Sequence, residues 1–305
     1  MNTGEQQGHA SGGDAVEGHQ FGGHQFGGHQ FGLSGGWTGD LPDVRDRALF
    51  PPVGSPRDGE EPPASLDLAV PEPGPTSLVD WQVPVLQQSP LQSCVSCAVA
   101  SVVRHLDADG RPVADPGPSA MFLYYNTRVL EGTGRCDVGT GIRSALKALR
   151  RWGVCSEERW AYARQLAERP AQEAYDQALY AGTVTYRHVY RLGQEPDGLD
   201  LTAVRRALAN GLPVLFGFGV YDSFRAAGRG DPVPLPSPAE RVLFGHAAVL
   251  VGHDEEGFTA VNSWGEDWGD RGRFRLPIAY LQDRRLARDF WVITSLDGAE
   301  GTTAG

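Results

Sequence analysis

The hydrophobic pattern of this 305-residue chain changes its period once, and that change limits the folds that the chain can adopt. From Cys94 onward, Val95, Val99 and Val102 recur at helical spacing. After about residue 212, the short apolar runs LPVLFGFGVY, HAAVLVGH and GFTAVNSW are typical of strands. A helical half followed by a stranded half predicts an α+β fold with two lobes.

Further helices and a turn follow from local signals. A helix is expected around 121–130, and another over 140–152, where Gly153 stops it. The stretch DLTAVRRALANG, residues 200–211, predicts a helix closed by Asn210 and Gly211. A tight turn at 254–257 is expected to join the last two strands.

The composition divides the chain into four parts. Residues 1–35 are rich in Gly, Gln and His and contain three tandem GHQFG repeats, so we expect a disordered tail. Residues 36–76 carry the stretch GWTGDLPDVRDRALF and then a Pro-rich, solvated linker. The folded domain is expected over 77–296, from near Ser77, and residues 297–305 are expected to be disordered.

Charge and hydropathy exclude several functions. A net charge of −11, with 27 Lys and Arg against 38 Asp and Glu, argues against binding to nucleic acid. No apolar run approaches the roughly 20 residues that a membrane-spanning helix needs. The first residues have neither a basic nor an apolar region typical of a secretory signal, so we expect a cytoplasmic location with mostly reduced cysteines.

Two cysteines three residues apart, Cys94 and Cys97, could form a redox pair, half a zinc site, or a nucleophile with a bystander. A redox pair of the thioredoxin type needs a βαβ context, and a zinc site needs a second Cys or His pair at similar spacing. The sequence has neither context. Far downstream, however, it places His246 on one predicted strand and Asn262 at the end of the next.

These segments resemble the papain family of cysteine peptidases. The resemblance is carried by VDWQVPVLQQSPLQSCVSCAVAS, FGHAAVLVGH and NSWGEDWGDRG, and SAMFLYYNTRVLEG, IRSALKALRRWGVCSEERWAY and GWTGDLPDVRDR resemble a bacterial branch of that family. The resemblance covers about residues 36–294. It implies a helical lobe, a β-rich lobe and an active site in the cleft between them, with a peptide or protein as substrate and no metal or organic cofactor.

The resemblance also indicates which cysteine is the nucleophile. In the family, a glutamine that donates to the oxyanion lies six residues before the nucleophile. Gln88 stands six before Cys94, whereas Leu91 stands six before Cys97. In the competing register Cys97 is the nucleophile and Cys94 becomes a disulfide partner. Gln92 departs from the family pattern, because it occupies a position that is usually glycine.

Each candidate residue then has a chemical role. A thiolate at a helix N-terminus beside an imidazolium is strongly favoured, which suits Cys94 with His246 as its partner. Asn262 would hold the imidazole ring, and Trp264 would shield that hydrogen bond from water. Gln88 and the backbone N–H of Cys94 would stabilise the oxyanion. The predicted activity is cysteine endopeptidase; an acyl transferase or amidase that acts on one dedicated peptide, and a peptide-binding module without turnover, remain alternatives.

Several other residues have weaker assignments. Cys97 is expected in the core, with a redox role as the sharper alternative, and Cys136 and Cys155 are expected to be buried thiols. By resemblance, Gly139 and Gly141 line the substrate cleft.

Near the start of the chain, a family-like motif of unassigned role could dock on the catalytic domain or be a propeptide remnant; it comprises Trp37, Asp40, Asp43, Arg45 and Asp46. For the GHQFG repeats we hypothesise self-cleavage after Gly22 and Gly27, against the alternatives of a flexible leader and of weak metal capture by His19, His24 and His29.

Overall fold

The computed structural model describes residues 35–43, 45–49, 74, 77–108, 116–162, 166–190, 200–226 and 231–296. The GHQFG repeats, most of the Pro-rich linker and residues 297–305 lie outside the described residues. Disorder, metal capture and self-cleavage in these parts therefore stay predictions.

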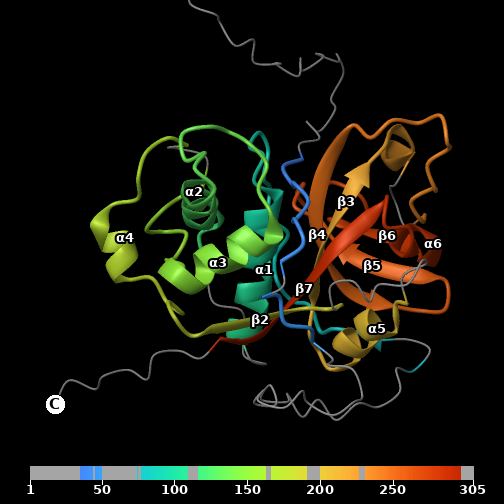
Figure 1. The fold of residues 1–305 in the computed structure, drawn as a ribbon, viewed down its shortest axis with the longest axis horizontal. Helices are drawn as coiled ribbons and strands as arrows, with labels where there is room; N and C mark the ends of the chain where they lie inside the picture. Colours follow the sequence, from blue (N-terminus) through green and yellow to red (C-terminus); the bar gives the residue numbers. More distant parts are fainter. Residues whose placement is uncertain are drawn as a thin grey trace, which may run out of the picture. The chain divides into compact units, whose positions relative to one another are not determined.

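The predicted helices are present, and the first three of them pack together on one side of the molecule (Figure 1). They are α1 (Cys94–Ala108), α2 (Ala120–Leu130) and α3 (Ile142–Trp152), with the short α4 (Gln172–Asp176) beyond them. α3 begins at Ile142 and not at the predicted Thr140, because Thr140 pairs as an isolated bridge with Trp37. Gly153 ends α3 with a positive φ of 69°, a conformation that glycine adopts without strain.

The described chain forms an antiparallel sheet of seven strands, all but β1 from its second half, in the order β2-β7-β3-β4-β5-β6, with β1 beside β4. The strands are β1 (Ser77–Leu78), β2 (Val184–His188), β3 (Val214–Val220), β4 (Phe244–His253), β5 (Gly257–Val261), β6 (Arg273–Pro277) and β7 (Ala287–Leu296). The helices α5 (Thr202–Ala209) and α6 (Ile278–Gln282) accompany the sheet. The predicted strands correspond to β3, β4 and β5, whereas the sequence patterns did not reveal β1, β2, β6 or β7.

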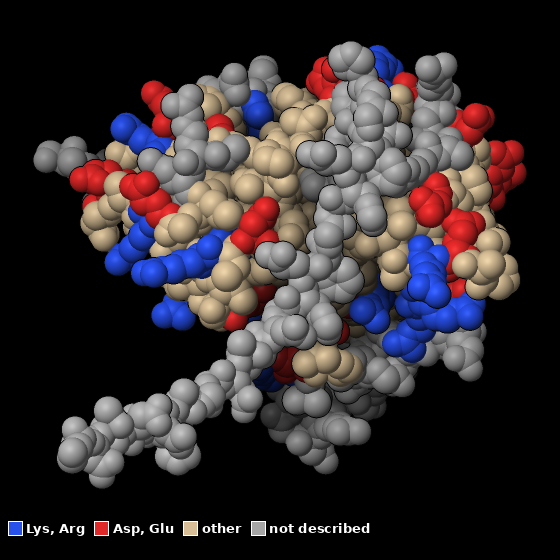
Figure 2. All heavy atoms as spheres, turned by 90° about the horizontal axis from the view of Figure 1, so that it is seen from above, with Lys and Arg blue, Asp and Glu red and all other residues tan. Residues whose placement is uncertain are grey.

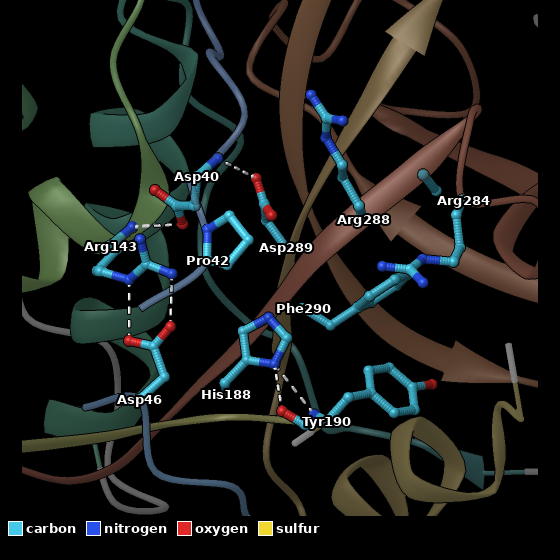
Figure 3. A pocket seen from close by; sticks show the side chains of 11 residues that line it. Asp40, Pro42, Asp46, Arg143, His188, Tyr190, Arg284, Arg288, Asp289 and Phe290 are labelled. Carbon is cyan, nitrogen blue, oxygen red and sulfur yellow. Dashed lines mark hydrogen bonds and ion pairs between the residues drawn. The ribbon is translucent and has the colours of Figure 1, made fainter. Parts of the chain in front are cut away.

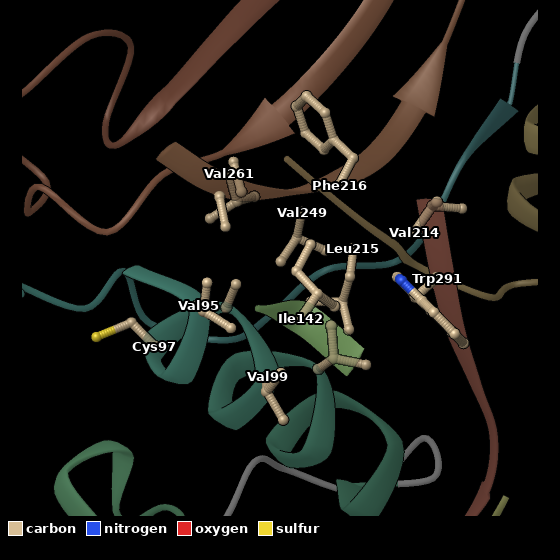
Figure 4. Close-up of a cluster of buried hydrophobic side chains, with 14 of the residues drawn as sticks. Val95, Cys97, Val99, Ile142, Val214, Leu215, Phe216, Val249, Val261 and Trp291 are labelled. Carbon is tan, nitrogen blue, oxygen red and sulfur yellow. The ribbon is translucent and has the colours of Figure 1, made fainter. Parts of the chain in front are cut away.

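The hydrophobic core lies between α1, α3 and the sheet (Figure 4). α1 is buried without a break from Cys94 to Val103, so it is a central helix without an outer polar face over that stretch. Val95 and Val99 of α1 belong to the same buried cluster as Leu215 of β3 and Trp291 of β7. Burial of each such apolar side chain contributes about 1.5–3 kcal/mol, which holds the start of α1 firmly against the sheet.

A segment near the start of the chain also docks on this domain. We call residues 35–43 and 45–49 the strap; it runs between the helices and the sheet (blue in Figure 1). The backbone N–H groups of Gly36 and Trp37 donate to the carbonyl of Gly245 on β4, at 3.0 and 3.2 Å. On the other side, Trp37 forms a parallel bridge with Thr140. Of the two expected roles for this motif, the structure therefore shows docking.

Two carboxylates anchor the strap. Asp40 accepts hydrogen bonds from the backbone N–H of Arg143 in the first turn of α3 and from the indole N–H of Trp291 on β7, both at 3.1 Å. Its own backbone N–H donates to Asp289 at 2.8 Å. Asp46 forms a two-pronged ion pair with the Arg143 guanidinium, at 2.9 and 2.5 Å. The strap thus ties α3 to β7.

The described surface mixes charges of both signs. On the face seen in Figure 2, Lys and Arg side chains lie beside Asp and Glu side chains. In the described ranges, no helix is both long enough and apolar enough to cross a membrane.

Candidate functional site

A buried histidine and asparagine meet where β4 and β5 lie side by side. The ring Nε2 of His246 lies 2.7 Å from Oδ1 of Asn262, and both residues are buried. The same Oδ1 accepts the backbone N–H of Ser263 at 2.7 Å, which identifies it as the amide oxygen. Since that oxygen can only accept, Nε2 carries the proton and the neutral ring keeps its lone pair on Nδ1. Nδ1 of His246 has no hydrogen-bond partner in the described part of the chain.

An indole covers this pair. The ring of Trp264 lies 4.6 Å from the His246 ring, centroid to centroid, with 31° between the planes. Trp264 is only 2% exposed. Trp264 therefore lies against the imidazole, the position that its predicted shielding role requires.

The candidate nucleophile heads the central helix. Cys94 is the first residue of α1 and is fully buried. The backbone N–H of Ala247, which follows His246 in β4, lies close enough to the thiol to favour its ionisation. The sulfur therefore lies against β4 beside the backbone that carries His246, and no described hydrogen bond links it to Nδ1 of that ring. Because α1 begins there, its partly positive N-terminus also faces the sulfur.

Burial controls the protonation of both groups. Burial raises the pKa of Cys94 well above that of an ordinary thiol, and the N–H of Ala247 offsets only part of this effect. Burial lowers the pKa of His246 to about 4, against the opposing effect of its hydrogen bond to Asn262. With the strap docked, the site therefore favours a neutral thiol and a neutral imidazole.

The predicted oxyanion donor lies within reach of the site. Gln88 is fully buried, and its Oε1 accepts the hydroxyl of Ser263 at 2.7 Å, which fixes the amide orientation. Its Nε2 donates to the carbonyl of Leu91 at 3.0 Å and to the carbonyl of Gly35 at 3.1 Å. The strap therefore occupies the amide that was predicted to donate to an oxyanion.

The other cysteines are separate from this arrangement. All four cysteines are free, so no disulfide joins Cys94 to a partner. Cys97 is buried as predicted, and its sulfur lies 3.7 Å from the hydroxyl of Ser93. Burial raises the pKa of Cys97 to about 12. Cys155 is buried as predicted, but the prediction for Cys136 was wrong: it is exposed, because it lies in the loop between α2 and α3.

Sequence reasoning missed two contributors. Ser263 positions both Gln88 and the Asn262 oxygen, and Gly245 accepts the two N–H groups of the strap. The sequence offered one signal for them: Ser263 directly follows Asn262, and Gly245 directly precedes His246. Gly139 and Gly141, which were expected to line the cleft, pack closely against the strap at Gly36 and Asp40.

One cavity of about 190 Å³ lies apart from these residues (Figure 3). The strap, α3, β7 and the end of β2 form its wall. The residues that line it include Asp40, Asp46, Arg143, His188, Arg288 and Asp289. In the described ranges, no group of three or more His, Cys, Asp or Glu side chains is arranged to hold a metal ion.

Comparison with known proteins identifies the family. The model of the papain family of cysteine proteases matches residues 78–284. An uncharacterized peptidase C1-like protein of Acanthamoeba polyphaga mimivirus is 34% identical over 213 residues, which are 68% of each chain. A cathepsin B-like protein of Giardia intestinalis is 38% identical over 95 residues, 29% of this chain and 31% of its own length.

The solved structures agree with this assignment. Xylellain, a cysteine protease from Xylella fastidiosa, matches with a TM-score of 0.70 and 27% identity, over 87% of this chain and 97% of its own. Digestive procathepsin L 3 of Tenebrio molitor, at 19% identity and a TM-score of 0.54, shares the fold over 82% of this chain and 76% of its own. The chain therefore belongs to the papain family of cysteine proteases and is a cysteine-type peptidase with the α+β papain-like fold.

Proposed function

We propose that this protein hydrolyses peptide bonds with Cys94 as nucleophile, His246 as proton acceptor and donor, and Asn262 as the residue that orients the imidazole. One observation supports this proposal most. The hydrogen bond from His246 Nε2 to Asn262 leaves Nδ1 without a described partner, and the Cys94 thiol lies against β4 at Ala247, the residue after His246. A base with an unused lone pair beside a thiol is the arrangement that thiol nucleophiles need.

The proposed reaction passes through a thioester. The thiol proton of Cys94 moves to Nδ1 of His246, and the thiolate attacks the carbonyl carbon of the scissile bond. The oxyanion accepts hydrogen bonds from Nε2 of Gln88 and from the backbone N–H of Cys94, each worth about 3–4 kcal/mol in comparable sites. The C–N bond then breaks, and the imidazolium gives its proton to the leaving amine. Water attacks the thioester with His246 as base, and the thiolate leaves.

We also propose that the strap inhibits this site while it is docked. The carbonyl of Gly35 accepts a hydrogen bond from the Gln88 amide. The backbone N–H groups of Gly36 and Trp37 donate to the carbonyl of Gly245. A substrate strand would need these same backbone and side-chain groups. The strap must therefore leave, or be cut, before a peptide can bind. The likeness to xylellain supports a further proposal, that the chain groups with a bacterial branch of the family.

Hydrolysis in ¹⁸O-labelled water tests the reaction. The purified protein is incubated with a peptide mixture in labelled water, and the masses of the products are measured. Hydrolysis through a thioester puts one ¹⁸O atom into the new carboxyl group of the acyl product, and Cys94→Ala forms no product. Transfer of the acyl group to an added amine without ¹⁸O uptake would contradict hydrolysis and indicate an acyl transferase.

A further inference from the structure

Two cysteines of α1 lie one helical turn apart. Cys94 is the first residue of the helix, and the backbone N–H of Cys97 donates to the carbonyl of Ser93 at 3.0 Å, which closes the first turn. Residues three apart in a helix lie on the same face, with their Cα atoms about 5 Å from each other. This separation falls inside the range of about 4.4–6.8 Å that a disulfide bridges.

The Cys97 side chain faces the turn that carries Cys94. Its sulfur lies 3.7 Å from the hydroxyl oxygen of Ser93, the residue directly before Cys94. This direction is usual, because side chains of a helix lean toward its N-terminus. Burial, and to a smaller extent a charge on the Cys97 sulfur, raise the pKa of Cys94, as expected for two neighbouring thiols. Figure 4 shows Cys97 on α1 beside Val95.

A chain of hydroxyl groups leads away from the Cys97 sulfur. The Tyr162 hydroxyl donates to the carbonyl of Gln88 at 2.6 Å and contacts the hydroxyl of Ser93. Ser93 therefore donates to Tyr162 and accepts from the Cys97 thiol while that thiol is protonated. When Cys97 ionises, the Ser93 hydroxyl can turn and donate to the sulfur instead. The polar contact thus favours a Cys97 thiolate, against the burial that raises the pKa of Cys97 to about 12.

The start of α1 permits the small movement that a bridge requires. Cβ atoms three residues apart in a helix are about 5–6 Å from each other, whereas bridged Cβ atoms are about 3.5–4.5 Å apart. The N–H of the first helical residue makes no hydrogen bond within the helix, so Cys94 can approach Cys97 while the rest of α1 stays in place. A bridge across a single helical turn departs from relaxed disulfide geometry, and such bridges are readily reduced.

We propose that Cys97 is the resolving thiol of a reversible redox switch, in which a peroxide oxidises Cys94 and a Cys94–Cys97 disulfide then turns the peptidase off. The inference rests on the proposed peptidase function and adds a mode of regulation to it. Cys94 is fully buried in the strap-docked form, so oxidation is expected once the strap has left. The disulfide stops hydrolysis and protects Cys94 from irreversible oxidation.

The oxidation has two balanced steps. The Cys94 thiolate attacks one oxygen of hydrogen peroxide, the O–O bond breaks, and Cys94 becomes a sulfenic acid while the leaving oxygen departs as water with the thiol proton. The Cys97 thiolate then attacks the sulfenic sulfur, so that the S–S bond forms and the S–O bond breaks. The hydroxide leaves as a second water with the Cys97 proton. Two thiols lose two electrons and one peroxide gains them, and an external dithiol reverses the bridge by exchange.

Mapping of the oxidised thiols tests the switch without any need for turnover. The full-length Gly36→Ala protein is used, because a methyl group on Gly36 would lie 1.9 Å from the carbonyl oxygen of Gln92 and loosen the strap. The unchanged protein is treated in parallel for a longer time. Each sample is exposed to hydrogen peroxide, unfolded, alkylated with iodoacetamide and analysed by mass spectrometry. We expect a Cys94–Cys97 bridge that is about 2 Da lighter than the two thiols, resists alkylation and disappears with dithiothreitol.

Two serine variants identify the resolving thiol. Without Cys97 the sulfenic acid at Cys94 has no neighbouring thiol to attack it, so Cys97→Ser is expected to accumulate at least about 5-fold more sulfinic and sulfonic acid at Cys94. Cys155→Ser is the matched control, since Cys155 is also a buried thiol whose pKa burial raises to about 12. The control should form the Cys94–Cys97 bridge as the unchanged protein does and recover its activity with dithiothreitol.

Three results would overturn the switch. They are equal amounts of sulfinic acid with and without Cys97, a bridge from Cys94 to Cys136 or Cys155, and a Cys94 that stays reduced in both Gly36→Ala and the unchanged protein. Peptide hydrolysis is measured on the same samples before oxidation. A Cys94–Cys97 bridge in a protein that cleaves no peptide would refute the peptidase and leave the redox pair standing, whereas hydrolysis without a bridge would do the reverse.

Discussion

The side-chain amide of Gln88 donates to the backbone carbonyl of Gly35, 3.1 Å away. The residue expected to stabilise an oxyanion thus holds a carbonyl of the chain's own strap. The contact joins residues 53 positions apart in the sequence and is fully buried on the Gln88 side. It links the resting arrangement of the strap directly to the proposed chemistry.

A substitution that dislodges the strap should therefore expose the thiol. Gly36 has a φ of 137°, and a methyl group on it would lie 1.9 Å from the carbonyl oxygen of Gln92. Such a backbone clash at a positive φ costs about 1–3 kcal/mol of docking free energy. We expect Gly36→Ala to raise both peptide hydrolysis and Cys94 alkylation by at least about 5-fold.

Gly132→Ala is the matched control, because Gly132 also has a positive φ of 77° but nothing lies within 4 Å of an added methyl. Unchanged alkylation in Gly36→Ala would show that the docked strap does not limit access to the thiol.

The two neighbouring cysteines should differ sharply in their effect on activity. We expect Cys94→Ala to abolish hydrolysis, with a loss of about 10⁴-fold or more, because it removes the nucleophile at the start of α1. Cys97→Ala should keep most of the activity, since the Cys97 sulfur lies against Ser93 and not at the start of α1, where Cys94 stands. Initial rates on one peptide compare the two proteins. Comparable activity in the two variants, or a greater loss in Cys97→Ala, would show that Cys94 is not the nucleophile.

The pH dependence of kcat/KM should change when the strap is displaced. Burial raises the pKa of Cys94 and lowers the pKa of His246 to about 4 in the docked form, so the ion pair is disfavoured there. In Gly36→Ala, water reaches both groups, and kcat/KM should be bell-shaped, with an acidic limb for thiolate formation and a basic limb for loss of the imidazolium. Asn262→Ala should lower this rate and leave the thiol open to alkylation. A flat profile from mildly acidic to mildly alkaline pH would contradict the ion-pair mechanism.

Asp40 should make docking of the strap sensitive to pH. Burial, and then the neighbouring Asp289, raise the pKa of Asp40 to about 7. A carboxyl with a raised pKa binds its proton more tightly in the docked form, so this contribution to docking is complete below about pH 4 and is lost as the pH rises through about 7. An asparagine at this position stays neutral and can still accept from Arg143 and Trp291.

The measurement is the Cys94 alkylation rate of the unchanged protein divided by that of Asp40→Asn, because this ratio cancels the ionisation of the thiol itself. We expect the ratio to rise between pH 5 and pH 8. Asp176→Asn, at an exposed position on α4, should give a constant ratio. A constant ratio for Asp40→Asn as well would show that ionisation of Asp40 does not affect docking of the strap.

Local periodicity in the sequence was sufficient to predict the helix headed by Cys94 and the strands that carry His246 and lead to Asn262. Apolar residues at helical or strand spacing predict an element wherever burial on one face decides its stability. Through the resemblance to the papain family, the six-residue spacing from Gln88 to Cys94 indicated Cys94, and not Cys97, as the candidate nucleophile. These features depend on neighbours within a few turns of the chain, so they are readable without a structure.

Only the tertiary structure decided the contacts between distant segments. The strap motif was visible in the sequence, but its hydrogen bonds from Trp37 to Gly245 and from Asp40 to Asp289 join residues about two hundred or more positions apart. Gly217 lies opposite Arg288 because β7, the last strand in sequence, pairs beside β3. No local pattern encodes which strands become neighbours, since strand order follows from the packing of the whole sheet on α1 and α3. The candidate catalytic residues could therefore be named from short stretches of sequence. Their burial and their protonation states depend on the tertiary fold.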